Sequence, residues 1–150
     1  MLALARRASA RVSVRVVVPV VIVIAMLAAC TPLNSPELSL FNSTNDLRAS
    51  NGERKLAEFD RLTSDARAWA ARLAAEGQLS HEDLHQLGVE WTMAAENVGR
   101  AGSIEEIESL LQQSPEHRAN MLNASYFLTG VGTARAKDGT LYAVQLFIKS

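Results

Sequence analysis

Two strand-like stretches near the end of the chain decide the fold: Gly-Val-Gly-Thr-Ala-Arg at 130–135 and Leu-Tyr-Ala-Val-Gln-Leu-Phe-Ile at 141–148. Asp138-Gly139 lies between them, and this dipeptide is a strong hairpin signal. Alternate side chains of the second stretch point to opposite faces of a sheet. One face collects Tyr142, Val144, Leu146 and Ile148, and the other Leu141, Ala143 and Phe147, with Gln145 as the only polar member. Because both faces are apolar, both need cover from other elements.

Four segments with a helical period can supply this cover. The clearest follows Thr63 as N-cap and ends at Gly77, with apolar residues at i, i+3, i+4, i+7 and i+8. The others begin at Ser35-Pro36-Glu37, at the capping box of Ser103 and Glu106, and at Ser114-Pro115-Glu116. Residues 55–62 read as a connection, 80–87 as at most two turns of helix, and 95–98 as a short strand. The predicted fold is α+β, a three-layer α/β/α sandwich with a small antiparallel sheet covered by helices on both faces.

The first thirty residues have a different composition. Four arginines and no acidic residue come first, and 16–29 is then apolar with only Pro19 interrupting it. Fourteen residues fall short of the roughly 20 that a membrane-spanning helix needs, but they match the apolar region of a signal peptide. The stretch ends Leu27-Ala28-Ala29-Cys30, which resembles the lipobox of bacterial lipoproteins, whose signal is cut before an acylated cysteine. An ordinary secretory signal with a chance cysteine is the alternative.

These observations divide the chain into a lipoprotein signal peptide at 1–29, a lipidated Cys30 with a short tether at 30–35, and one domain at 36–150. We expect the protein to be exported and lipid-anchored at the extracytoplasmic face of the cell membrane. After Cys30 the chain carries 16 acidic and 11 basic residues, a net charge near −5. That balance argues against nucleic acid as a partner and leaves the acyl group at Cys30 as the membrane link.

The sharpest short motif is His81-Glu82-Asp83-Leu84-His85, which matches H-E-x-x-H. In zinc peptidases the two histidines share one helix face and bind Zn²⁺, and the glutamate is the general base. Here Gly88 ends the segment three residues later, and no third ligand stands at a recognised spacing. We interpret the match as a coincidence and keep zinc-dependent hydrolysis through this motif as the alternative enzymatic hypothesis.

A longer set of residues, met in order along the chain, carries more information. It comprises Asn45, Arg48, Trp69-Ala70, Leu79-Ser80-His81, Glu96-Asn97, Ser114-Pro115, His117-Arg118, Asn120, Leu122, Gly130-Val131-Gly132 and the 142–147 strand. This set resembles the bacterial form of the CAP (SCP-like) extracellular domain family, named for cysteine-rich secretory proteins, venom antigens and pathogenesis-related plant proteins. The resemblance covers roughly residues 36–150.

The resemblance implies a cleft lined by two histidines and two acidic residues, in which the histidines of some members bind a divalent cation. Carried over, the ligand-binding residues are His81, Glu96 and His117, with His81 and His117 as ligands of Zn²⁺ or a similar ion. Glu96 would be a further ligand or a carboxylate that orients a histidine. The second acid is missing from the stretch 110–114; Glu116 could replace it, although its position at a helix start already has a structural explanation.

No nucleophile, base and orienting group stand together in the sequence, so we assign no catalytic residue. The expected function is non-catalytic binding of a divalent cation, a lipid or another envelope ligand. Two alternatives stay open besides the hydrolase: a purely structural module of the envelope, and a His117 that only forms hydrogen bonds within the fold.

Overall fold

The computed structural model describes residues 31–150, so the predicted signal peptide at 1–29 and the predicted lipidation site Cys30 lie outside the described residues. Within 31–150, no helix is both long enough and apolar enough to span a bilayer. The elements in chain order are α1 (Ser35–Ser50), β1 (Ala57–Glu58), α2 (Asp60–Glu76), the 3₁₀ turn η1 (Leu84–Gln86), β2 (Met93–Ala101), α3 (Ile104–Gln113), α4 (Pro115–Leu122), β3 (Leu128–Arg135) and β4 (Leu141–Lys149).

The strands form one sheet in the order β1-β3-β4-β2. As predicted, β3 and β4 form an antiparallel hairpin, and β2 is antiparallel to β4 on its other side. The sheet is mixed and not purely antiparallel, because β1 pairs with β3 in parallel through Ala57 and Glu58. We expected a connection there, since two residues are too few to show an alternating pattern.

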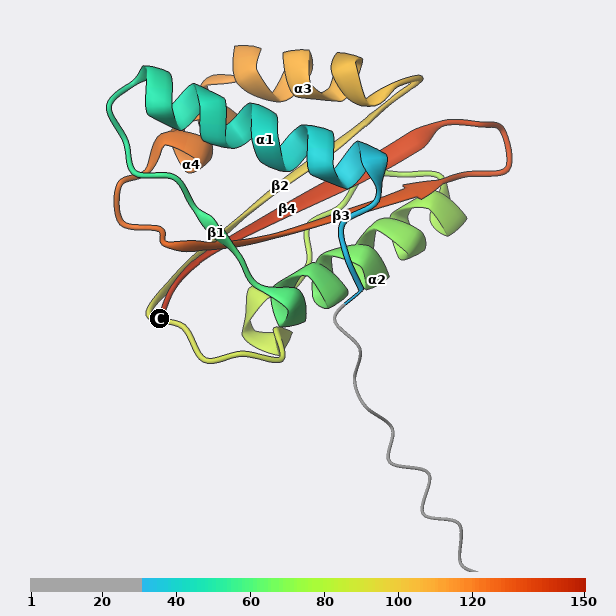
Figure 1. Ribbon diagram of the computed structural model, residues 1–150. Helices are drawn as coiled ribbons and strands as arrows, with labels where there is room; N and C mark the ends of the chain where they lie inside the picture. The colour runs from blue at the N-terminus through green and yellow to red at the C-terminus, as the bar shows by residue number, and fades with distance from the viewer. Residues whose placement is uncertain (1–30) are drawn as a thin grey trace, which may run out of the picture.

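The three predicted layers are confirmed (Figure 1). All of β4 except its last residue is buried. On one face α2 packs against alternate residues of β4; this cluster includes Leu62, Ala66, Ala70, Leu73, Tyr142, Val144, Leu146 and Ile148. On the other face α1, α3 and α4 enclose Leu40, Ile107, Leu111, Met121, Ala143 and Phe147. Helices therefore cover both apolar faces of the hairpin.

Two glycines of β3 let α2 lie directly on the strand. A Cβ built on Gly130 would collide with the α2 backbone at Leu62, and one on Gly132 would collide with it at Ala66. Only a residue without a side chain allows this approach. The contact also places Arg67, the residue after Ala66, beside β3.

The start of α2 and the capping bonds of α1 and α4 differ from the predictions. The first turn of α2 begins at Asp60 and not after Thr63, because the N–H of Phe59 donates to Thr129 in the sheet and ends the extended chain there. The N-cap of α1 is Asn34, whose side chain forms a capping box with Glu37. Ser114 occupies the N-cap of α4, but its side chain makes no capping bond.

Candidate functional site

The candidate site is built around Glu96, on the edge strand β2. Its side chain is only 2% exposed, whereas that of His81, in the loop after α2, is 67% exposed. The Nδ1–H of His81 donates to Glu96 Oε1 over 2.7 Å, and the N–H of Glu82 donates to the same oxygen over 3.1 Å. The structure thus brings His81 and Glu96 together and leaves Nε2 of His81 without a role in this pair.

The other oxygen of Glu96 is buried and has no hydrogen-bond partner within residues 31–150. Burial raises the pKa of Glu96, and the hydrogen bond from His81 opposes this shift. A buried acceptor left unpaired costs stability, so this oxygen indicates a carboxyl group that the fold alone does not satisfy.

Glu82 is a second acid beside Glu96, whereas the sequence suggested it only as the general base of the H-E-x-x-H motif. One of its oxygens is also buried without a hydrogen-bond partner among the described residues. Burial, and next the charge of Glu96, raise the pKa of Glu82 to about 7. A hollow of about 320 Å³ opens beside it, lined in part by Trp69, Arg72 and Gln86. In the sequence, the position of Glu82 next to His81 was the only indication that it belongs to the site. Its contact with Glu96 depends on how the loop after α2 folds.

His117 lies in the first turn of α4 and is half-buried. Burial lowers its pKa, the charge of His81 lowers it further, and Glu116 acts in the opposite direction. The carbonyl of His117 accepts a hydrogen bond from Asn97, the residue after Glu96 on β2, which places this turn of α4 beside that strand. Glu116 is exposed, so its role in the structure is at the helix start and not inside the site.

A chain of buried amides holds α4 against the sheet. Asn97 Nδ2 donates to the backbone carbonyl of His117 and to Gln145 Oε1, each over 3.1 Å. Asn120 Nδ2 donates to Asn97 Oδ1 over 2.9 Å, and Gln145 Nε2 donates to Thr44 Oγ1 over 2.7 Å. The network explains why β4 has one polar residue, Gln145, among the apolar side chains on the face covered by α1, α3 and α4. It also fixes the backbone of His117 relative to the strand that carries Glu96.

A family model described as the cysteine-rich secretory protein family, CAP, matches residues 41–147. The chain belongs to the CAP family. A comparison with curated protein sequences gives no match.

Solved structures share the fold of this CAP domain. An outer surface protein of Borrelia burgdorferi is 17% identical with a TM-score of 0.70, and the match covers 79% of this chain and 96% of that protein. A cysteine-rich secretory protein of Staphylococcus aureus is 22% identical with a TM-score of 0.65, over 79% of this chain and 41% of that chain. A crystal structure of NaASP2 with Zn²⁺ is 12% identical with a TM-score of 0.59, over 77% of this chain and 80% of that one.

Two early residues of the CAP resemblance have structural roles. The guanidinium of Arg48 is fully buried, and its Nη1 donates to the carbonyls of Met121 and Asn123 over 2.7 and 3.0 Å. It thereby satisfies carbonyls at the end of α4 that have no partner within the helix. Asn45 exchanges two hydrogen bonds with the backbone of Leu56 and holds the chain before β1.

The H-E-x-x-H motif of this CAP domain does not lie on an α-helix. Residues 81–83 have no helical structure and η1 covers only Leu84–Gln86. The ring of His81 bonds Glu96, whereas that of His85 lies against Trp91 with 5.4 Å between ring centroids. The shared helix face that a zinc peptidase needs is therefore not formed. Within residues 31–150, no group of three or more His, Cys, Asp or Glu side chains is arranged to hold a metal ion.

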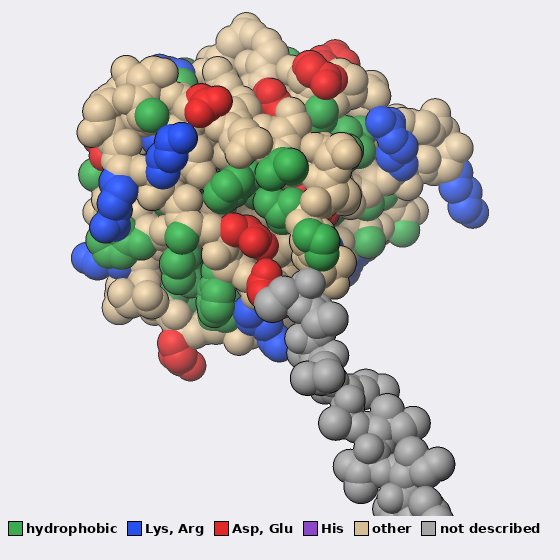
Figure 2. Space-filling model, viewed as in Figure 1, with side chains coloured by type: hydrophobic (Ala, Val, Ile, Leu, Met, Phe, Trp, Pro, Cys, Tyr) green, Lys and Arg blue, Asp and Glu red, His purple; other side chains and the backbone are tan. Residues whose placement is uncertain are grey.

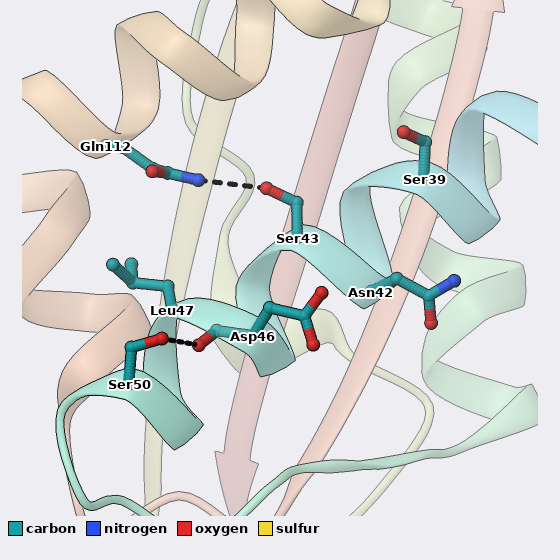
Figure 3. A pocket seen from close by; sticks show the side chains of 7 residues that line it. All are labelled: Ser39, Asn42, Ser43, Asp46, Leu47, Ser50 and Gln112. Atoms are coloured by element: carbon teal, nitrogen blue, oxygen red, sulfur yellow. Dashed lines mark hydrogen bonds between the residues drawn. The ribbon is translucent and has the colours of Figure 1, made fainter.

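A larger hollow, of about 560 Å³, lies elsewhere along α1 (Figure 3). It is lined by hydroxyl and amide side chains, and Gln112 of α3 donates to Ser43 across it over 2.9 Å. Asp46 is its only titratable group. This hollow is not part of the site formed by His81, Glu96 and His117.

Proposed function

We propose that this CAP domain is a lipid-anchored, extracytoplasmic binding protein whose His81 and His117 bind a divalent cation such as Zn²⁺. The observation that carries the proposal is the bond from His81 Nδ1 to the buried Glu96. A carboxylate that accepts from one ring nitrogen orients the imidazole and leaves the other nitrogen to bind a metal.

The second histidine suits the same ion. Burial lowers the pKa of His117, which favours the neutral imidazole that a metal ion requires. With two imidazole ligands and an outer carboxylate, the remaining coordination positions belong to water or to a ligand. NaASP2, a structural relative, was crystallised with Zn²⁺, which supports this ion as the first to test.

The expected partner is a component of the cell envelope and not nucleic acid. Lys and Arg side chains on the face shown in Figure 2 are interspersed with Asp and Glu and form no continuous basic surface there. The membrane link is the acyl group proposed at Cys30, the only cysteine of the sequence. The outer surface protein among the structural relatives is consistent with this location.

Zinc titration calorimetry tests the cation site. We expect His81→Ala and His117→Ala each to remove most Zn²⁺ binding, and His85→Ala to leave it unchanged. His117→Ala is a clean test because Asn97 bonds the backbone carbonyl and not the ring. The opposite pattern, with His85 required and His117 dispensable, would support the hydrolase. Absence of Zn²⁺ binding in the parent protein would favour a purely structural module.

Membrane fractionation tests the anchor separately. The parent protein should sediment with membranes and carry the mass of an acyl modification on its N-terminal peptide, and Cys30→Ser should abolish both. An unmodified cysteine in the exported protein would contradict the anchor while leaving the cation site to be judged by calorimetry.

A further inference from the structure

The first described residues are bonded to the body of the domain. Arg67 of α2 donates through Nη1 to the carbonyl of Thr31 over 3.2 Å and through Nη2 to that of Pro32 over 2.9 Å. Asn34 caps α1, and its amide lies 3.4 Å from Thr133 Oγ1 on β3. The part of the predicted tether that the structure describes is therefore not a free linker.

Arg67 is itself held by Glu37, whose side chain is fully buried. Its Nε donates to Glu37 Oε1 over 2.9 Å and its Nη2 to Oε2 over 2.6 Å. The backbone N–H groups of Asn34 and Thr133 donate to the same carboxylate. A two-pronged guanidinium–carboxylate pair has a fixed geometry, so the carbonyls of Thr31 and Pro32 meet a rigid donor. We call Glu37 and Arg67, with the two carbonyls, the anchor clamp.

The anchor clamp lies at one edge of the sheet and the candidate site at the other. β1 pairs with only the first two residues of β3, and Glu37 reaches Thr133 farther along that strand. The N-terminal segment runs beside β3, between α1 and α2 (Figure 1). Glu96 lies on β2, which is the last strand at the opposite edge.

We propose that the anchor clamp turns the β3 edge toward the bilayer, with the lipid headgroup region as its partner, and directs the site of His81, Glu96 and His117 away from it. This inference rests on the lipid anchor proposed at Cys30. Cys30 is the residue before Thr31, and consecutive Cα atoms are 3.8 Å apart. An acyl chain on Cys30 is thus attached one residue from a segment bonded to α2, and too little free chain remains for the domain to rotate.

The orientation restricts the ligands that the site can meet. A site facing away from the membrane is open to ions, soluble molecules and wall components in the extracytoplasmic space. Lipids of the membrane that carries the anchor would meet the β3 edge instead. The anchor clamp therefore favours a ligand that does not come from the bilayer supporting the protein.

Thiol labelling of the lipidated protein in vesicles of phosphatidylcholine and phosphatidylglycerol tests the orientation. An acylated Cys30 has no free thiol, so a cysteine introduced elsewhere is the only reactive one. Ala71→Cys places a label one turn after Arg67 on α2, and Glu116→Cys places one beside His117; both positions are exposed. With a fluorescent label and a nitroxide on the lipid headgroup, we expect loss of fluorescence at position 71 and none at position 116.

Two variants separate the clamp from the anchor. Arg67→Lys keeps a positive charge near Glu37, but its three N–H donors cannot replace the four bonds that Arg67 makes to Glu37, Thr31 and Pro32. A Gly-Ser insertion after Cys30 leaves the clamp intact but adds free chain. Each should reduce the difference between the two labels. Equal quenching at positions 71 and 116 in the anchored parent would overturn the orientation alone. A parent that reacts with the thiol label and does not bind vesicles would overturn the anchor, and the orientation with it.

Discussion

Two buried glutamates at opposite edges of the sheet have very different surroundings. Glu37 receives four donors, two on each oxygen, from Arg67 and from the backbone of Asn34 and Thr133. Glu96 receives two donors, both on one oxygen, and its other oxygen has no partner in the described part of the chain. One carboxylate is fully satisfied by the fold and the other is not.

The partners differ as much as the carboxylates. Arg67 is 25% exposed and is always charged, whereas His81 is 67% exposed and has a ring nitrogen to spare. A fully paired carboxylate contributes to stability, and breaking the pair strands a buried charge. A carboxylate with unused capacity, paired with an exposed imidazole, can serve binding instead. The CAP domain thus has a fully paired buried carboxylate at the β3 edge and a partly unpaired one at the β2 edge, where we propose that the cation binds.

The largest expected effect is a loss of stability when the ion pair at the β3 edge is broken. Arg67→Ala removes the only cation that bonds the buried Glu37 within residues 31–150, and we expect the free energy of unfolding to fall by about 3 kcal/mol. Urea denaturation followed by tryptophan fluorescence measures it. Arg72→Ala, which breaks the exposed pair with Glu76 on the same helix, is the control and should change little. If the two substitutions lowered the free energy of unfolding equally, the buried pair at the β3 edge would have no special role in stability.

At the β2 edge the larger effect should be on binding. Glu96→Gln removes the charge that orients His81, and we expect Zn²⁺ affinity to fall by about 10–100-fold, the usual cost of losing such an outer carboxylate. Calorimetry measures the affinity, and circular dichroism checks that the fold is kept. Unchanged affinity in a folded variant would mean that the carboxylate does not support the ion.

Loss of the imidazole should cost less stability than loss of the guanidinium. His81→Ala deletes one donor to Glu96 but leaves that oxygen its bond from the Glu82 N–H. Because the ring is mostly exposed, we expect a loss of about 1 kcal/mol in the free energy of unfolding. A loss as large as that of Arg67→Ala would show that the β2 edge is a stability element too.

The smallest expected effect is a pH dependence from Glu82. Its pKa is raised from 4.5 to about 7, so the folded state keeps a proton that the unfolded state loses above pH 4.5. The metal-free domain should therefore lose stability as the pH rises from about 4.5 to about 7, by at most about 1 kcal/mol after allowance for solvent screening. Thermal unfolding with a chelator present measures it, and Glu82→Gln should flatten this part of the profile. A stability that rises through this window in the parent would contradict the shift.

Most elements of the CAP domain could be predicted from the sequence because their signals are local. The Asp138-Gly139 turn, the stop at Gly77 and the apolar period of α2 each depend on residues a few positions apart. The prediction was wrong where a partner distant in the sequence sets the start of a helix. Threonine is a residue type that favours the N-cap position, but α2 begins before Thr63 because Phe59 pairs with β3.

The candidate site was predictable only in part. His81, Glu96 and His117 were selected by family resemblance, and the structure places the first two in direct contact. Glu82 was considered only as the general base of the H-E-x-x-H motif, since nothing in the sequence around it shows that its carboxyl is buried beside Glu96. The anchor clamp was not predicted either, because Glu37 and Arg67 are 30 residues apart on different helices and no local pattern pairs them.

What the sequence determined by itself is the layering. A last strand that is apolar on both faces requires helices on both sides, because apolar surface left in water costs free energy in proportion to its area. What only the tertiary structure decided is which buried carboxylates have hydrogen-bond partners for both of their oxygens. A carboxylate is paired or left unpaired by groups that meet across the fold, and the sequence around Glu37 and Thr133, which are 96 positions apart, carries no local trace of their contact.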